Sequence, residues 1–167
     1  MKRALLVRAG FENELVDAFL RTSAVHVGWE RLGDLAGMKS DRVDAALLRE
    51  YPECRTVGGA PCKHYREITD FALVAQPGDT VVTPDRAGRR FLVGTVSGPY
   101  HFNRASRLWS GGEPYMQSLP VSWTHAVSRD DVAKSALTDT DQRGKTTFWL
   151  KPATLEEIAK APRIALG

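Results

Sequence analysis

The chain has 167 residues, of which 43% are hydrophobic and 26% charged, and it carries a net charge of +3. This composition is that of an ordinary globular protein, and the length suits one domain over residues 1–167 with a sizeable core. No apolar stretch is long enough to cross a bilayer, and the apolar start ends at Arg8, too early for a signal peptide. We therefore expect a cytoplasmic protein that does not act at a membrane.

The hydrophobic pattern predicts alternating short strands and helices. Strands are expected at 3–8, 24–29, 80–83, 90–97, 119–127 and 146–150. Helices are expected at 11–21, with Glu12 and Glu14 in the first turn, and at 41–51, 61–75 and 154–160, with a short one beginning at 129. The sequence predicts an α+β fold, a small mixed and mostly antiparallel β-barrel of about six strands with flanking helices. Its core would cover about residues 3–150, followed by a C-terminal helix and tail at 152–167.

The basic residues are unevenly distributed. Residues 86–112 contain neither Asp nor Glu but hold five arginines, which are Arg86, Arg89, Arg90, Arg104 and Arg107. One interpretation is a solvated arginine face. The other is a surface for nucleic-acid phosphates, because guanidinium groups match phosphate oxygens in geometry.

The residues that would suggest catalysis or metal binding lack the required spacing. Cys54, Cys62 and His64 do not have the tight pairing of a zinc site, and a disulfide is unusual in a cytoplasmic protein. We expect two free thiols, no metal and no cofactor. No serine or cysteine lies in a nucleophile-elbow sequence, so the sequence proposes no catalytic residue and no reaction.

Two groups of short motifs follow one another along the chain. The first is Val27-Gly28-Trp29 with Leu32-Gly33-Asp34-Leu35, and the second comprises 78–82, 94–102, 119–123 and 127–129. In this order they resemble the EVE-like domains of the PUA-like superfamily, over about residues 3–150. The layout is also similar to the YTH domain, a relative that reads methylated adenine in RNA.

The resemblance implies a base-reading module, as found in modification-dependent restriction enzymes, that takes a flipped methylated cytosine or adenine into an aromatic pocket. It implies Trp29 in that pocket, with Trp109 or Tyr115 from the following loop. Tyr100 stands at the position of a family aromatic, where a structural role is also compatible. Polar groups would read the base edge, and the candidates are Ser97, Asn103, Ser110 and Asp34. The five arginines of residues 86–112 would hold phosphates.

The residues by themselves leave alternatives to this interpretation open. Trp123 and Trp149 lie in predicted strands and are expected in the core, whereas Trp109 has no periodic apolar partners and suits a pocket. Three functions remain open: a reader of modified DNA in a restriction or defence system, an RNA-binding module, and a sensor of a small nucleotide-like ligand. The resemblance favours DNA over RNA, with a nuclease or NTPase as partner or fused domain.

Overall fold

The computed structural model describes residues 2–55, 58 and 61–167. The α-helices are α1 (Val16–Thr22), α2 (Ser40–Glu50), α3 (Tyr65–Thr69), α4 (Lys134–Thr140) and α5 (Pro152–Lys160). The 3-10 turns are η1 (Glu30–Leu32), η2 (Pro52–Cys54) and η4 (Arg129–Asp131), and η3 (Asp70–Val74) is a π-turn. The strands are β1 (Ala4–Val7), β2 (Ala24–Val27), β3 (Thr80–Asp85), β4 (Arg90–Val96), β5 (His101–Phe102), β6 (Trp109–Ser110), β7 (Glu113–Pro114), β8 (Gln117–Ser128), β9 (Thr147–Trp149) and β10 (Arg163–Ile164).

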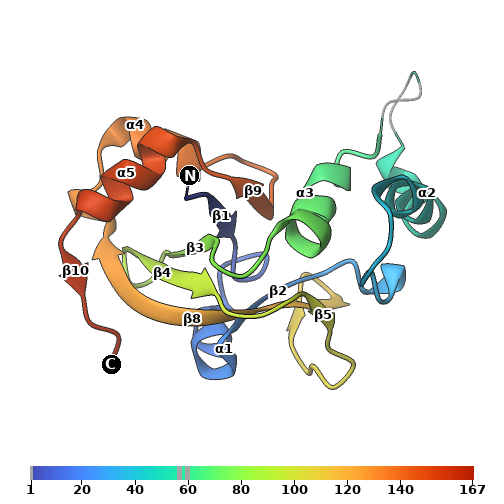
Figure 1. Cartoon of the computed structure of the whole chain (residues 1–167), viewed down its shortest axis with the longest axis horizontal. Coiled ribbons are helices and arrows are strands. Elements are labelled where there is room, and N and C mark those ends of the chain that lie inside the picture. The colour runs from blue at the N-terminus through green and yellow to red at the C-terminus, as the bar shows by residue number, and fades with distance from the viewer. Residues whose placement is uncertain (1, 56–57, 59–60) are drawn as a thin grey trace.

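The central sheet has the strand order β10-β8-β4-β3-β1-β9, with β2 and β5 paired to β8 off this path. The β1–β3 pair is parallel and the others are antiparallel. β8 pairs with β2 and β5 near its start and with β4 and β10 further along, so it joins two parts of a curled sheet (Figure 1). The structure confirms an α+β fold with a mixed sheet, which forms a half-barrel rather than a closed barrel.

Both faces of the sheet are covered. Along β1, Leu5 and Val7 belong to one hydrophobic cluster while Ala4 and Leu6 belong to the other, because successive strand residues point to opposite faces. α4 and α5 pack over one face, and α1, α2 and α3 contribute to the cluster on the other (Figure 1). Each of the six predicted strands has a counterpart. Trp123 and Trp149, expected in the core, are only partly buried against one hydrophobic cluster, where the indole N–H of Trp123 donates to the Phe19 carbonyl at 3.0 Å.

Two helix predictions are wrong at their boundaries. α1 begins at Val16 rather than at residue 11, because Gly10 and Asn13 have φ values of 87° and 67° that a helix cannot contain. Glu12 and Glu14 therefore precede the helix instead of lying in its first turn. The helix predicted at 61–75 begins only at Tyr65, with α3, and ends at Val74, with η3.

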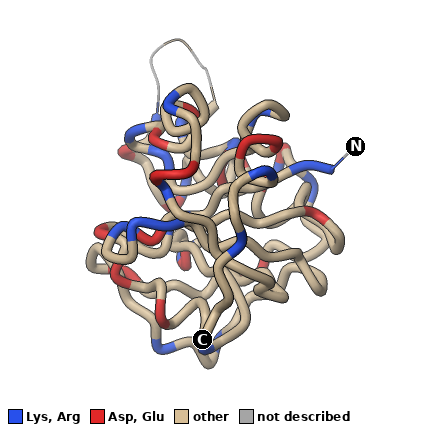
Figure 2. Tube along the Cα trace, turned by 90° about the vertical axis from the view of Figure 1, so that its left-hand side faces the viewer, with Lys and Arg blue, Asp and Glu red and all other residues tan. Residues whose placement is uncertain are grey.

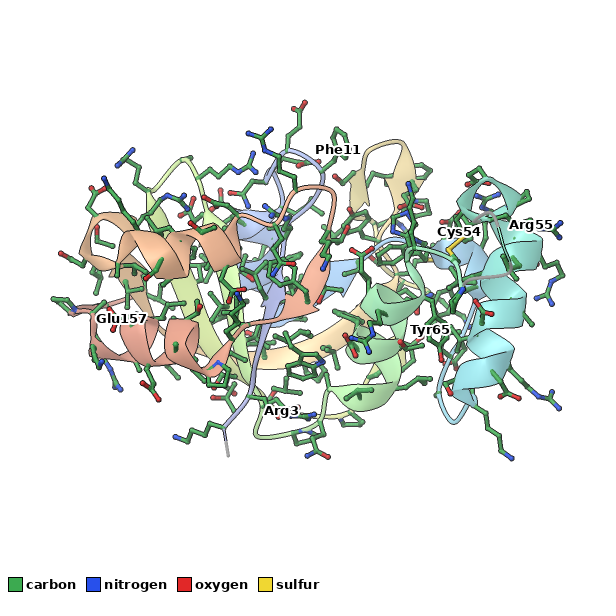
Figure 3. The ribbon with its side chains drawn as sticks, turned by 90° about the horizontal axis from the view of Figure 1, so that it is seen from above. Arg3, Phe11, Cys54, Arg55, Tyr65 and Glu157 are labelled. Atoms are coloured by element: carbon green, nitrogen blue, oxygen red, sulfur yellow. A yellow bond between two sulfur atoms is a disulfide. The ribbon has the colours of Figure 1, made fainter. Side chains whose placement is uncertain are left out.

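The expectation of two free thiols is also wrong. Cys54 and Cys62 form a disulfide with a Cα–Cα distance of 5.2 Å, within the ordinary range for this bond. η2 ends at Cys54, and Cys62 lies just before α3, so the bond ties the end of η2 to the start of α3 (Figure 3). Both sulfur-bearing side chains are buried. Among the described helices, none combines the length and apolar character needed to cross a membrane.

Candidate functional site

A cleft of about 800 Å³ opens at the ends of several loops. The loop with Phe11 lies between the β3–β4 turn and the β6–β7 hairpin in the view from above (Figure 3). Seven Lys and Arg side chains but only three Asp and Glu side chains line the cleft. Along the trace as a whole, acidic and basic positions are mixed (Figure 2), so this excess of cations is local.

One side of the cleft is what we call the cationic wall. It draws on the residue after β1, the β3–β4 turn, η4 and the loop before β9, and its members are Arg8, Arg86, Arg89, Arg90, Arg129, Arg143 and Lys145. Several segments far apart in sequence thus bring positive charge to one place. Such a concentration of guanidinium groups favours an anionic ligand, above all one with phosphate oxygens.

Carboxylates orient much of this wall. Arg90 Nε contacts Asp85 Oδ2 at 2.8 Å, and Arg129 Nη2 contacts Asp141 Oδ2 at 2.6 Å. Arg89 Nη2 contacts Asp130 Oδ1 at 2.6 Å, and both side chains are exposed. Exposed ion pairs of this kind contribute little free energy and are screened by salt. They can therefore position a guanidinium without preventing it from binding a ligand.

Arg8 is anchored by two backbone carbonyls of the loop before β9. Its Nε donates to the Lys145 carbonyl at 2.7 Å and its Nη2 donates to the Gln142 carbonyl at 2.8 Å. Burial lowers the pKa of Arg8, and the nearby positive charge of Arg86 lowers it further. Two cations crowded together in this way are stabilised when an anion binds between them.

The other side is the aromatic wall, which consists of Trp29, His64, Ser110, Glu113 and Tyr115. Trp29 follows β2 with φ at 58°, and its side chain is 7% exposed. Its carbonyl accepts a hydrogen bond from Gln117 Nε2 at 3.1 Å. The ring centroid lies 5.5 Å from that of His64, whose Nδ1 is 2.6 Å from Glu67 Oε2. Gln117 thus holds the backbone of Trp29, and His64 packs against its ring.

The loop with Phe11 is attached to the β6–β7 hairpin. The backbone N–H of Phe11 donates to Ser110 Oγ at 2.6 Å, and the Ser110 hydroxyl donates to Glu14 Oε1. Burial alone would raise the pKa of Glu14, but the hydrogen bonds from Ser110 and the backbone outweigh it, so the pKa is lowered. Burial raises the pKa of Tyr115, which keeps that phenol neutral.

Six of the sequence-predicted site residues line this cleft. The structure brings together Trp29, Tyr115 and Ser110 on the aromatic wall, and Arg86, Arg89 and Arg90 on the cationic wall. These two groups come from separate parts of the sequence, and the prediction assigned them to base and phosphate, respectively.

The remaining predicted residues are not in the described lining of the cleft, and they are Trp109, Tyr100, Ser97, Asn103, Asp34, Arg104 and Arg107. Trp109 is 61% exposed on β6. The Tyr100 hydroxyl donates to Gln117 Oε1 and accepts from the Leu35 N–H at 3.1 Å, a structural role in which burial raises its pKa to about 12. Asp34 and Asn103 each accept a bond from a backbone N–H two residues on, at 2.9 and 3.1 Å, within local turns.

Several lining residues were missed by sequence reasoning. On the cationic wall they are Arg8, Arg129, Arg143 and Lys145, and elsewhere they are Phe11, His64 and Glu113. Only the chain topology brings these positions together, although the basic pair Arg143 and Lys145 in a Gly-containing loop was a usable signal. Within the described residues, no group of three or more His, Cys, Asp or Glu side chains is arranged to hold a metal ion.

A family model described as a domain of unknown function (DUF8426) matches residues 6–150. The chain belongs to this family. The match to DUF8426 includes every residue of the cleft lining and stops before α5 and β10. The cleft is therefore built wholly from the DUF8426 portion of the chain. No curated protein matches this chain.

Proposed function

We propose that this chain is a nucleic-acid-binding reader in which the cleft holds one nucleotide of a strand. The base would lie against the aromatic wall and the neighbouring phosphates against the cationic wall. The observation that carries this proposal is the joining, in a single cleft, of seven cationic side chains with the buried ring of Trp29 and with Tyr115.

The free energy of stacking in the cleft is comparable with the cost of extracting a base from its stack. Stacking of a base on an aromatic side chain contributes ~1–3 kcal/mol by alanine substitution and tolerates any base. Extracting the base costs a few kcal/mol, which phosphate contacts and polar contacts to the base edge must offset. The cleft volume of about 800 Å³ lies within the usual range for small-ligand sites.

The type of fold and the kind of base are proposed from the sequence motifs. We infer that the half-barrel is a PUA-like fold of the EVE type, since its motifs resemble those domains in order and extent. From the same resemblance we propose that the base is methylated, at cytosine or adenine, and that the strand is DNA in a restriction or defence system. Catalysis would then belong to a nuclease or NTPase partner or fused domain in the cytoplasm, with this chain as the recognition part.

The proposal can be tested by fluorescence anisotropy with labelled oligonucleotides. The panel comprises single- and double-stranded DNA and RNA, unmodified or carrying one methylated cytosine or adenine, across a series of salt concentrations. We expect the affinity for a modified strand to exceed that for its unmodified match and to fall steeply with salt. Absence of binding to every member of the panel would overturn the proposal.

A second candidate function is a sensor of a small nucleotide-like ligand. It is favoured by the volume of the cleft, about 800 Å³, which suits a single nucleotide. Under this alternative a free mononucleotide competes as well as an oligonucleotide, and affinity does not grow with strand length. A reader instead gains affinity and salt dependence as flanking phosphates are added.

A further inference from the structure

Glu113 differs from the other acids of the cleft. Asp85 and Asp141 contact arginines of the cationic wall, at 2.8 and 2.6 Å. Glu113 instead lies on β7, among Trp29 and Tyr115 of the aromatic wall. Within the described part of the chain it forms no ion pair with a lysine or arginine. A half-buried carboxyl group beside two aromatic rings is therefore available to a ligand.

The glycine that follows β2 leaves space for this side chain. A Cβ atom at Gly28 would lie 2.0 Å from Glu113 Oε1, so any other residue at this position would force the Glu113 side chain to move. Glu113 and Trp29 both line the cleft, and a backbone interaction with Trp29 lowers the pKa of Glu113 against the effect of burial. The position of Glu113 is thus coupled to the residue whose ring we assign to the base.

A second acid lies behind Glu113. Burial raises the pKa of Glu113, and the adjacent Glu30 carboxylate raises it further. An ionised carboxyl group offers only acceptor oxygens, and Glu113 presents this group at the lining of the cleft.

We propose that Glu113 reads the edge of the base at the aromatic wall and selects bases with an exocyclic amino group over bases with a carbonyl at that position. This inference rests on the proposed function of the cleft. Carboxylate side chains accept hydrogen bonds from the cytosine N4 amino group, and adenine presents an N6 amino group in the same way. A base carbonyl would place two acceptors against each other, with no donor between them.

The test uses two pairs of bases that differ in this group. In otherwise identical labelled oligonucleotides, one position carries 5-methylcytosine or thymine, or else adenine or hypoxanthine. For the strand type that binds, we expect the amino-bearing member to bind on the order of tenfold more tightly than its carbonyl partner. Equal or weaker binding of the amino-bearing member would overturn the inference while leaving the proposed function intact.

The variant Glu113→Gln tests whether this side chain causes the preference for amino-bearing bases. A glutamine amide both donates and accepts, so it can pair with either member of each pair, and the preference should fall to about twofold or less. Glu156→Gln is the matched control, because Glu156 lies on α5 outside the matched family range and the charge change is the same. If Glu113→Gln retains the full preference, Glu113 is not the reader. If no oligonucleotide binds the wild-type protein, the proposed function fails as well.

Discussion

The cationic wall draws its seven side chains from four segments, whereas the aromatic wall takes its five from three segments around β2, α3 and the β6–β7 hairpin. Arginines such as Arg89 are exposed and held by ion pairs, while Trp29 is buried and fixed through its backbone and ring. Exposed charged side chains exchange partners easily, whereas a buried ring keeps its position. We therefore expect the cationic wall to set affinity and its salt dependence, and the aromatic wall to determine which base is accepted.

The largest effect is expected at Trp29. Trp29→Ala removes the stacking surface and should weaken oligonucleotide binding by about 10- to 100-fold, from ~1–3 kcal/mol of stacking. Anisotropy titrations measure the loss, and thermal unfolding checks that the variant is folded at the temperature of the assay. Trp149→Ala is the control, because Trp149 lies on β9 outside the described lining of the cleft, 4.4 Å from the Arg3 guanidinium. An equal loss in both variants would remove the special role of Trp29.

The next effect separates arginines that line the cleft from arginines outside its described lining. The double variant Arg86→Gln with Arg143→Gln should lower the slope of log Kd against log salt by about 1.4–1.8, or 0.7–0.9 per phosphate contact. The matched double variant Arg104→Gln with Arg107→Gln should leave the slope near the wild-type value, because these two side chains do not line the described cleft. The reverse result would place the phosphates on the 103–108 loop.

A smaller effect is expected at the rim. Phe11 is 80% exposed and lines the cleft at its edge, a position from which an aromatic ring can fill the gap left by an extracted base. Phe11→Ala should weaken binding to duplex DNA roughly fivefold, with little effect on a single strand, which has no gap to fill. Parallel titrations of both strand types measure the difference. A similar loss for both strand types would show that Phe11 contacts the nucleotide itself.

The smallest effect is expected at Trp109. Its side chain is 61% exposed on β6 and does not belong to the described lining of the cleft. A surface substitution changes free energies by up to ~0.5 kcal/mol, so Trp109→Ala should alter affinity by about twofold or less. A loss as large as that of Trp29→Ala would move the base site to the outer face of the hairpin.

Much of the fold follows from local sequence, and the candidate site follows only in part. The period-two pattern that predicts β4 is local, so its two faces can be read from Phe91, Val93 and Leu92. The start of α1 could not be read, because Asn13 adopts a left-handed conformation that is tied to distant partners. Its amide donates to the Pro84 carbonyl at 2.6 Å and its Oδ1 accepts from the Arg86 N–H at 2.7 Å.

The candidate site, too, was predicted only where local sequence indicates it. Trp29, Tyr115 and the arginines of the β3–β4 turn were identified from motif and charge. Arg8 was missed because it reaches the cleft only after β1 pairs with β9, which brings it beside the 142–145 loop. The disulfide was missed because we expected a cytoplasmic protein, in which such a bond is unusual, whereas the fold places Cys54 next to Cys62. Long-range pairing therefore determines the positions that local sequence patterns cannot predict.

Photo-crosslinking can locate the bound base in the complex. An oligonucleotide with a single 5-iododeoxycytidine is bound to the wild-type protein and irradiated, and the modified residue is identified by fragment mass spectrometry. If the base lies against the aromatic wall, the adduct forms on Trp29 or Tyr115. An adduct on Trp109 or within the 103–108 loop, with none on Trp29 or Tyr115, would refute the assignment of the base to this cleft.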